Sequence, residues 1–104
     1  MLTSKQKRFL KSKANRLRPS LQVGKNGLND AFVDDLVRTL ETHELLKINI
    51  LQNSDETAAE LSQTLAETIP NLTVVQSLGR VLTLYRPASK IKNRKLSEEV
   101  NAIK

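Results

Sequence analysis

The sequence of 104 residues contains no cysteine and no tryptophan, and it has only three glycines, three prolines and one histidine. Without cysteine, the chain forms neither a disulfide framework nor a thiolate site. The single histidine, His43, stands near the end of an expected helix, where it interacts favourably with the helix dipole, and it leaves no Ser/His/Asp arrangement for catalysis. No apolar run approaches the ~20 residues of a membrane span, and the N-terminus lacks the apolar segment of a signal peptide. We therefore expect one cytoplasmic, non-enzymatic domain with a modest core.

Acidic residues are absent from the first 29 positions, which carry eight lysines and arginines. Residues 30–85 reverse this balance, with three basic and nine acidic residues, and residues 86–104 carry six basic and two acidic ones. A block of one sign that includes a segment expected to fold is typical of a surface that binds a polyanion. A solvated basic face that only aids solubility is the alternative.

Aromatic residues make up 3% of the chain and comprise Phe9, Phe32 and Tyr85. Both phenylalanines lie on apolar helix faces and are expected in the core, while Tyr85 either joins the core or stacks on a base. A sheet that binds RNA by stacking bases needs exposed aromatics. If the polyanion is a nucleic acid, their scarcity indicates contacts mainly with phosphate and sugar, which depend on shape more than on sequence.

Hydrophobic periodicity predicts seven elements in the order α-β-α-β-α-β-β. The first helix has a capping-box pattern at Thr3 and Gln6, and the second is capped by Asn29. Ser54 or Asp55 is the expected cap of the third helix. The elements are a helix over 3–16, a strand over 20–23, a helix over 30–42, a strand over 45–51, a helix ending at Pro70, and strands over 72–77 and 81–86 joined by a turn at 78–80. This order predicts a two-layer α/β fold in which helices pack on a four-stranded mixed sheet.

The folded domain is expected over residues 1–87, followed by a basic tail over residues 88–104. The tail is polar, which is typical of a disordered segment. Leu96, Val100 and Ile103 are nevertheless spaced as on one face of a short helix. The sequence leaves these two alternatives open.

Gly24 and Gly27 bracket Lys25 and Asn26 immediately before the second helix. Glycine lets another molecule approach the backbone closely, and a helix N-terminus offers free N–H groups to an anion. The stretch lacks the spacing of a P-loop or of a dinucleotide-binding loop, but it matches the GxxG loop of RNA-binding KH domains. It therefore predicts a phosphate-binding loop, which lies beside the basic segment if the first helix folds back next to the first strand. A tight turn that needs glycine only for its dihedral angles is the alternative.

Four stretches carry a family resemblance: LTSKQKRFLKSKAN, VGKNGLND, ELLKINIL and QSLGRVLTLYRP. With them the chain resembles, over about residues 2–87, the CRM domain of bacterial YhbY-type proteins and plant organelle splicing factors. The resemblance implies an RNA-binding module similar to the C-terminal domain of bacterial translation initiation factor three. It also implies an association with large-ribosomal-subunit precursors. In KH domains the GxxG loop joins two helices, whereas here it joins a strand to a helix, so KH base recognition is not implied.

We therefore predict a monomeric protein that binds ribosomal RNA and acts in assembly of the large ribosomal subunit. A general DNA- or RNA-binding protein and a module that binds an acidic protein are the alternatives. No cofactor, metal ion, membrane or small-molecule substrate is expected, and Asp30, Asp34 and Asp35 are interpreted as solvated helix residues. The predicted RNA-binding residues are Lys5, Lys7, Arg8, Lys11, Lys13, Arg16, Gly24, Lys25, Asn26, Gly27, Arg80 and Arg86.

Overall fold

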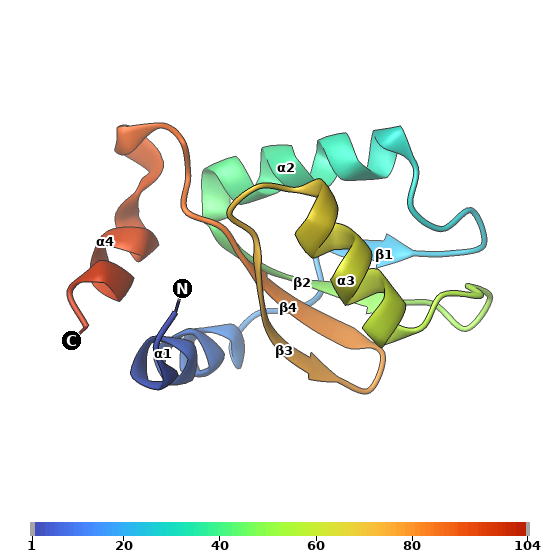
Figure 1. Cartoon of the computed structure of the whole chain (residues 1–104), viewed down its shortest axis with the longest axis horizontal. Helices are drawn as coiled ribbons and strands as arrows, with labels where there is room; N and C mark the ends of the chain where they lie inside the picture. Colours follow the sequence, from blue (N-terminus) through green and yellow to red (C-terminus); the bar gives the residue numbers. More distant parts are fainter. Residues whose placement is uncertain (1, 104) are drawn as a thin grey trace.

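A computed structural model describes residues 2–103 and places helices around one open, twisted sheet (Figure 1). The expected order of elements is confirmed, with two further helical segments after the last strand. The elements are α1 (Ser4–Ala14), β1 (Leu21–Val23), α2 (Asp30–His43), β2 (Leu45–Ile50), α3 (Ala58–Thr68), β3 (Thr73–Leu78), β4 (Val81–Tyr85), the 3-10 helix η1 (Ile91–Asn93) and α4 (Lys95–Asn101).

The four strands form a mixed sheet in the order β1-β2-β4-β3. β1 and β2 are parallel, with Leu21 opposite Ile48, because α2 crosses over between them. β4 pairs antiparallel with both β2 and β3, and the β3–β4 hairpin turns at Gly79, whose φ is +59°. The predicted parallel pair and antiparallel hairpin are therefore both present.

One face of the sheet is covered by α2 and α3, which together with the strands form the main core. Leu36 and Leu40 of α2 and Leu61 and Leu65 of α3 are fully buried there. The 3.6-residue periodicity of both helices supplies this apolar stripe. These helices and the sheet make the two layers that the sequence predicts.

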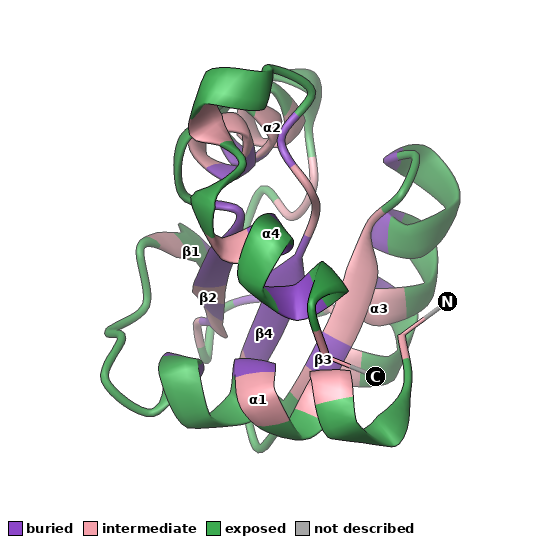
Figure 2. Cartoon of the chain, turned by 90° about the vertical axis from the view of Figure 1, so that its left-hand side faces the viewer, coloured by how far each residue is buried: buried purple, intermediate pink, exposed green. Residues whose placement is uncertain are grey.

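The opposite face is covered only at one end, by α1 and α4. Leu10 and Ala14 of α1 pack there against Leu45, Tyr85 and Val100. Figure 2 shows α4 in front of the strands and α1 beneath them, with exposed residues along the outer side of α1. This second cluster fixes the basic helix on a side of the sheet that α2 and α3 leave open.

The helix caps agree with the sequence in two cases and differ in the third. Thr3 and Gln6 form the complete capping box of α1, and the Asn29 side chain accepts a hydrogen bond from the Phe32 N–H at 2.8 Å. The cap of α3 is Thr57, whose hydroxyl accepts from the Glu60 N–H, so the prediction of Ser54 or Asp55 is wrong. The Ser54 hydroxyl instead accepts from the Glu56 N–H and stabilises the preceding turn.

The segment after β4 follows the fold closely because two carboxylates hold it: Glu41 of α2 and Glu44, which follows α2. Glu41 accepts hydrogen bonds from the N–H and the hydroxyl of Ser89 at 2.6–3.1 Å. Glu44 is 1% exposed, and its carboxylate accepts hydrogen bonds from the N–H groups of Ala88, Leu96 and Ser97 at 2.9–3.1 Å. The bonds from Leu96 and Ser97 cap the N-terminus of α4, where a negative charge is favoured. Of the two alternatives for the tail, this structure has the short helix, with Val100 fully buried.

Candidate nucleic-acid interface

The outer side of α1 presents a row of cations to solvent. Lys5, Arg8 and Lys11 are exposed, while Gln6, Leu10 and Ala14 on the other side face the sheet and α4. The Gln6 side chain donates to the Val100 carbonyl at 3.0 Å, which fixes the rotation of α1 about its axis. The spacing of three residues between successive cations therefore gathers these charges on one side of α1.

Among residues 2–103, these cations have no acidic partner within 4 Å. The ion pairs among residues 2–103 are Arg38–Asp35 on α2 and Arg86–Glu41. Like charges on one helix repel by a few tenths of a kcal/mol per pair. The exposed face of α1 is therefore a positively charged surface whose charge is balanced only by solvent ions.

The remaining basic residues of this segment lie at the flanks of α1. Lys7 is half-buried beside α3 and β3, and Lys13 lies near the start of β1, with its Nζ 5.5 Å from the centre of the Phe9 ring. Arg16 is exposed but belongs to the connection after α1, because the helix ends at Ala14 and not at residue 16 as expected. The three side chains extend the basic surface in different directions.

A polar strip on the sheet lies on the same side as α1, and the sequence reasoning did not assign it to the site. Side chains two apart along a strand share a face, so Lys47 and Asn49 lie on the face of Leu45, which packs against α1. Gln22 pairs directly with Asn49 and is exposed. The alternation of polar and apolar residues in ELLKINIL was the signal that could have identified this strip.

The loop after β1 forms a tight turn that is closed by its own backbone. The Gly27 N–H donates to the Gly24 carbonyl at 3.0 Å, and Gly27 has a φ of +60°. Lys25 and Asn26 form the exposed tip of the turn. The positive φ of Gly27 is what a tight turn that needs glycine for its dihedral angles requires, which was the alternative to a phosphate-binding loop. The side chains of Lys25 and Asn26 extend into solvent.

A carboxylate lies next to this loop. A Cβ added to Gly27 would lie 3.0 Å from Glu56 Oε1, and one added to Gly24 would lie 3.5 Å from Leu51. The Phe32 N–H at the start of α2 already donates to Asn29. An anion that approaches the tip of this loop is attracted by the charge of Lys25. An anion that approaches Gly27 is repelled by the Glu56 carboxylate, and the N–H groups there already donate hydrogen bonds within the protein.

The basic helix and the loop are not adjacent, so the predicted placement of α1 beside the first strand's loop is wrong. In Figure 1, α1 lies toward one end of the long axis and the β1–α2 loop lies at the other. The reason is packing: Leu10 and Ala14 of α1 are buried against β2, β3 and β4. The polar strip at Lys47, Asn49 and Gln22 lies between the two regions.

Arg80 and Arg86, the two arginines at the ends of β4, have different surroundings. Arg80 is exposed at the β3–β4 turn and donates to the Leu51 carbonyl at 3.0 Å, which places it at the same end of the sheet as the β1–α2 loop. The Arg86 side chain is 15% exposed and is paired with Glu41 at 2.7 Å. This geometry gives Arg86 a structural role, and its contact with RNA stays a prediction.

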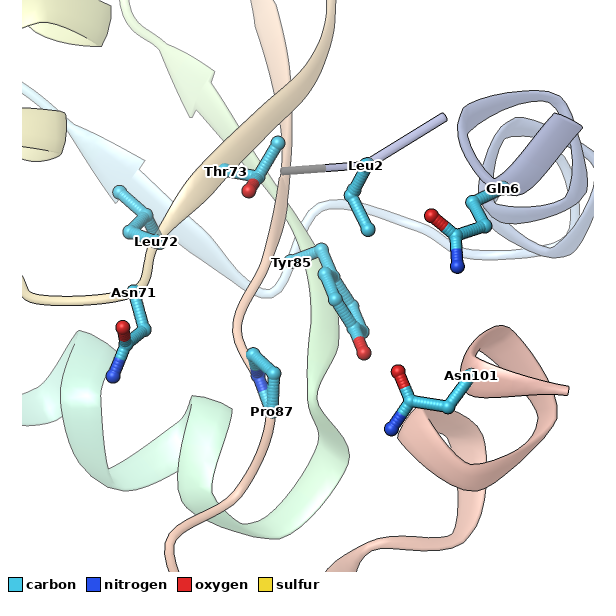
Figure 3. A pocket seen from close by; sticks show the side chains of 8 residues that line it. All are labelled: Leu2, Gln6, Asn71, Leu72, Thr73, Tyr85, Pro87 and Asn101. Carbon is cyan, nitrogen blue, oxygen red and sulfur yellow. The ribbon is translucent and has the colours of Figure 1, made fainter. Parts of the chain in front are cut away.

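Tyr85 belongs to the core, which answers the question that the sequence left open. The residue is 2% exposed and lies beside a hollow of about 340 Å³ between α1, β3 and α4, where Figure 3 shows it between Leu2 and Pro87. Burial, together with the nearby charge of Glu44, raises the pKa of Tyr85 to about 12. Stacking of this ring on a base is therefore excluded by its burial.

Two further expectations concern metal ions and membranes. The part of the chain that the structure describes has no cluster of three or more His, Cys, Asp or Glu side chains that could hold a metal ion. None of the helices within residues 2–103 is long and apolar enough to cross a bilayer. Asp30, Asp34 and Asp35 of α2 are exposed, as their interpretation as solvated helix residues requires.

Comparison with known proteins gives consistent matches over nearly the whole chain. The family model of the CRS1 / YhbY (CRM) domain matches residues 2–86. The chain is 40% identical over 96 residues to the probable RNA-binding protein YqeI of Bacillus subtilis, covering 92% of this chain and 99% of that protein. It is 37% identical over 97 residues to the probable RNA-binding protein PA4753 of Pseudomonas aeruginosa, covering 92% and 90% of the two chains.

A solved structure extends the match to three dimensions. The solution structure of the hypothetical protein SAV1595 from Staphylococcus aureus superposes with a TM-score of 0.71 at 38% sequence identity, covering 91% of this chain and 98% of that one. The family model, the sequence relatives and the shared fold agree with each other and with the four motifs found in the sequence. The chain therefore belongs to the CRS1 / YhbY (CRM) domain family.

Proposed function

We propose that this chain is a non-enzymatic, monomeric RNA-binding protein that binds ribosomal RNA in the cytoplasm and acts in assembly of the large ribosomal subunit. The observation that carries the proposal is the exposed face of α1, where Lys5, Arg8 and Lys11 lack acidic partners in the part of the chain that the structure describes. Relatives named as RNA-binding proteins support RNA as the polyanion. The ribosomal target follows from the resemblance to the CRM domain.

The surface that fits an RNA backbone runs from α1 across the polar strip of the sheet to Lys25 and Arg80. Because α1 and the β1–α2 loop lie at different ends of the molecule, one short contact does not reach both. An RNA that follows this surface meets cations at both ends and polar side chains between them. Such contacts go to phosphate and sugar and depend on RNA shape more than on base identity.

The salt dependence of binding tests the electrostatic part of the proposal. If the surface neutralises about six phosphates of a duplex-like RNA, log K falls with log salt with a slope near −5. Arg8→Ala should reduce the size of this slope by about one. Arg38→Ala is the matched control, because it removes an exposed helix arginine on the acidic side of the molecule. A flat salt dependence, or equal effects of the two variants, would contradict the proposal.

Crosslinking in cells tests the target. Ultraviolet crosslinking of the protein, followed by sequencing of the attached RNA, should yield reads concentrated on large-subunit ribosomal RNA and its precursors. Reads spread over many RNAs would instead favour the general RNA-binding alternative. An RNA yield equal to that of an uncrosslinked control would favour DNA or an acidic protein as the partner, and matched titrations with duplex DNA would distinguish these two.

A further inference from the structure

Two neighbouring hollows lie where the ends of α1, α2 and α4 meet. The first, of about 350 Å³, is lined by Lys13, Leu17, Ser20, His43, Leu45 and Leu96. The second, of similar volume, is lined by Thr42, His43, Glu44, Lys92, Asn93, Lys95 and Leu96. Because His43 and Leu96 line both, the hollows lie next to each other on either side of these two side chains, and we call the two hollows together the groove.

The groove combines apolar walls with a positively charged rim. Leu17 is 39% exposed, Leu96 is half-buried, and Leu45 closes the bottom of the first hollow. Lys13, Lys92 and Lys95 form the rim and are exposed. The acidic member, Glu44, is 1% exposed, and its oxygens are directed to three backbone N–H groups of the tail. The charge that the groove presents to solvent is therefore positive.

We propose that this groove binds an unpaired nucleotide of the RNA, with the base between His43 and the leucine side chains and the flanking phosphates on Lys13, Lys92 and Lys95. A histidine ring stacks on bases, and an apolar wall accepts the flat face of any base. The inference rests on the proposed RNA-binding function and names a subsite of it. Positions 92–96 lie outside residues 2–86, which the family model covers, so part of this subsite is supplied by the tail.

The shape and location of the groove agree with this occupant. The first hollow alone, with about 350 Å³, lies near the lower end of the ~300–1,000 Å³ range of ligand pockets, as expected for a single base rather than a larger ligand. Lys13 belongs to both α1 and the groove rim, so an RNA bound along α1 reaches the groove without leaving the basic surface. A paired base cannot enter, because its edge and faces are covered within the duplex.

Titrations with two RNAs of equal phosphate number test the inference: a duplex interrupted by a bulge of unpaired nucleotides, and an uninterrupted duplex. Wild-type protein should bind the bulged RNA about tenfold more tightly, within the range of ~5- to 160-fold that one stacked base gives. His43→Ala should bring this ratio close to one and leave the affinity for the duplex unchanged. Thr64→Ala, an exposed exchange on α3, should leave the ratio as it is.

A second variant and a spectroscopic probe give independent results. The double variant Lys92→Glu and Lys95→Glu, at two exposed positions, should weaken binding of the bulged RNA more than binding of the duplex. The fluorescence of 2-aminopurine placed in the bulge should change on binding to wild-type protein and not on binding to His43→Ala. Equal wild-type affinities for both RNAs, or an unchanged ratio in His43→Ala, would overturn the inference while the proposed function stands. Failure to bind either RNA would refute the proposed function and this subsite with it.

Discussion

Replacing Glu44 by glutamine tests how the tail is held on the domain. The Glu44 carboxylate accepts from Leu96 and Ser97 through Oε1 and from Ala88 through Oε2. A glutamine can keep its single oxygen toward the two α4 amides. Its NH2 group then faces the Ala88 N–H, so one donor loses its acceptor and is left buried.

The expected loss of stability follows from these contacts. A hydrogen bond to a charged group contributes about 1.5–3 kcal/mol, and a negative charge at a helix N-terminus adds about 0.3–1 kcal/mol. Relief of the cost of burying a charge offsets part of this loss. We therefore expect Glu44→Gln to lower the free energy of unfolding by about 2 kcal/mol.

Chemical denaturation measures the expected loss of global stability, and amide hydrogen exchange measures local detachment of α4. The amides of Leu96 and Ser97 should lose protection in Glu44→Gln before those of β2 and β4, because α4 detaches locally. Glu99→Gln is the control, since it removes an exposed carboxylate from α4 that does not hold the tail on the domain. Equal stability and equal protection in wild type and Glu44→Gln would refute the argument that this carboxylate anchors the tail.

Three further predictions concern the β1–α2 loop and the second tail anchor. Gly27→Ala should lower the free energy of unfolding by about 1–2 kcal/mol because φ is +60° and the new Cβ meets Glu56 Oε1 at 3.0 Å, whereas Gly24→Ala should have little effect in the same denaturation assay. Glu56→Gln should raise RNA affinity severalfold at low salt, and an unchanged affinity would remove the loop from the interface. Hydrogen bonds from Ser89 lower the pKa of Glu41, so its stabilising effect is present above the unfolded pKa near 4.5 and is lost as pH falls through the lower folded value. Glu41→Gln should remove that part of the acid dependence in thermal melts at pH 3–6, and an unchanged profile would contradict this assignment.

The sequence predicts most of the fold because its signals are local. Periodicity, caps at Thr3 and Asn29, and the glycine turn at residue 79 depend on residues within a few positions of one another. The cap of α3 was assigned wrongly because Ser54, Asp55 and Thr57 are all good cap residues. Only the hydrogen bonds of the folded loop decide which of them caps the helix.

The site was less predictable because it depends on packing between distant segments. The cations of α1 were visible in the sequence, but the side of the sheet that carries them was not. That side is set by Leu10 and Ala14, which pack on Leu45, Tyr85 and Val100. The Glu56 carboxylate lies beside Gly27, 29 positions away in the sequence, and Arg86 pairs with Glu41, 45 positions away. No local sequence pattern predicts contacts between residues so far apart.

The two edges of the sheet have a consequence for the behaviour of many copies together. Open sheets tend to associate through unpaired strand edges, and short or bulged edge strands oppose this. Here one edge is β1, with three residues, and the other is β3, which has a bulge between Val74 and Gln76. Neither edge strand offers a long, regular row of unpaired backbone N–H and C=O groups with which a strand of another molecule could pair. Neighbouring copies of the chain, even when crowded together, therefore find little to pair with along the edges of each other's sheets.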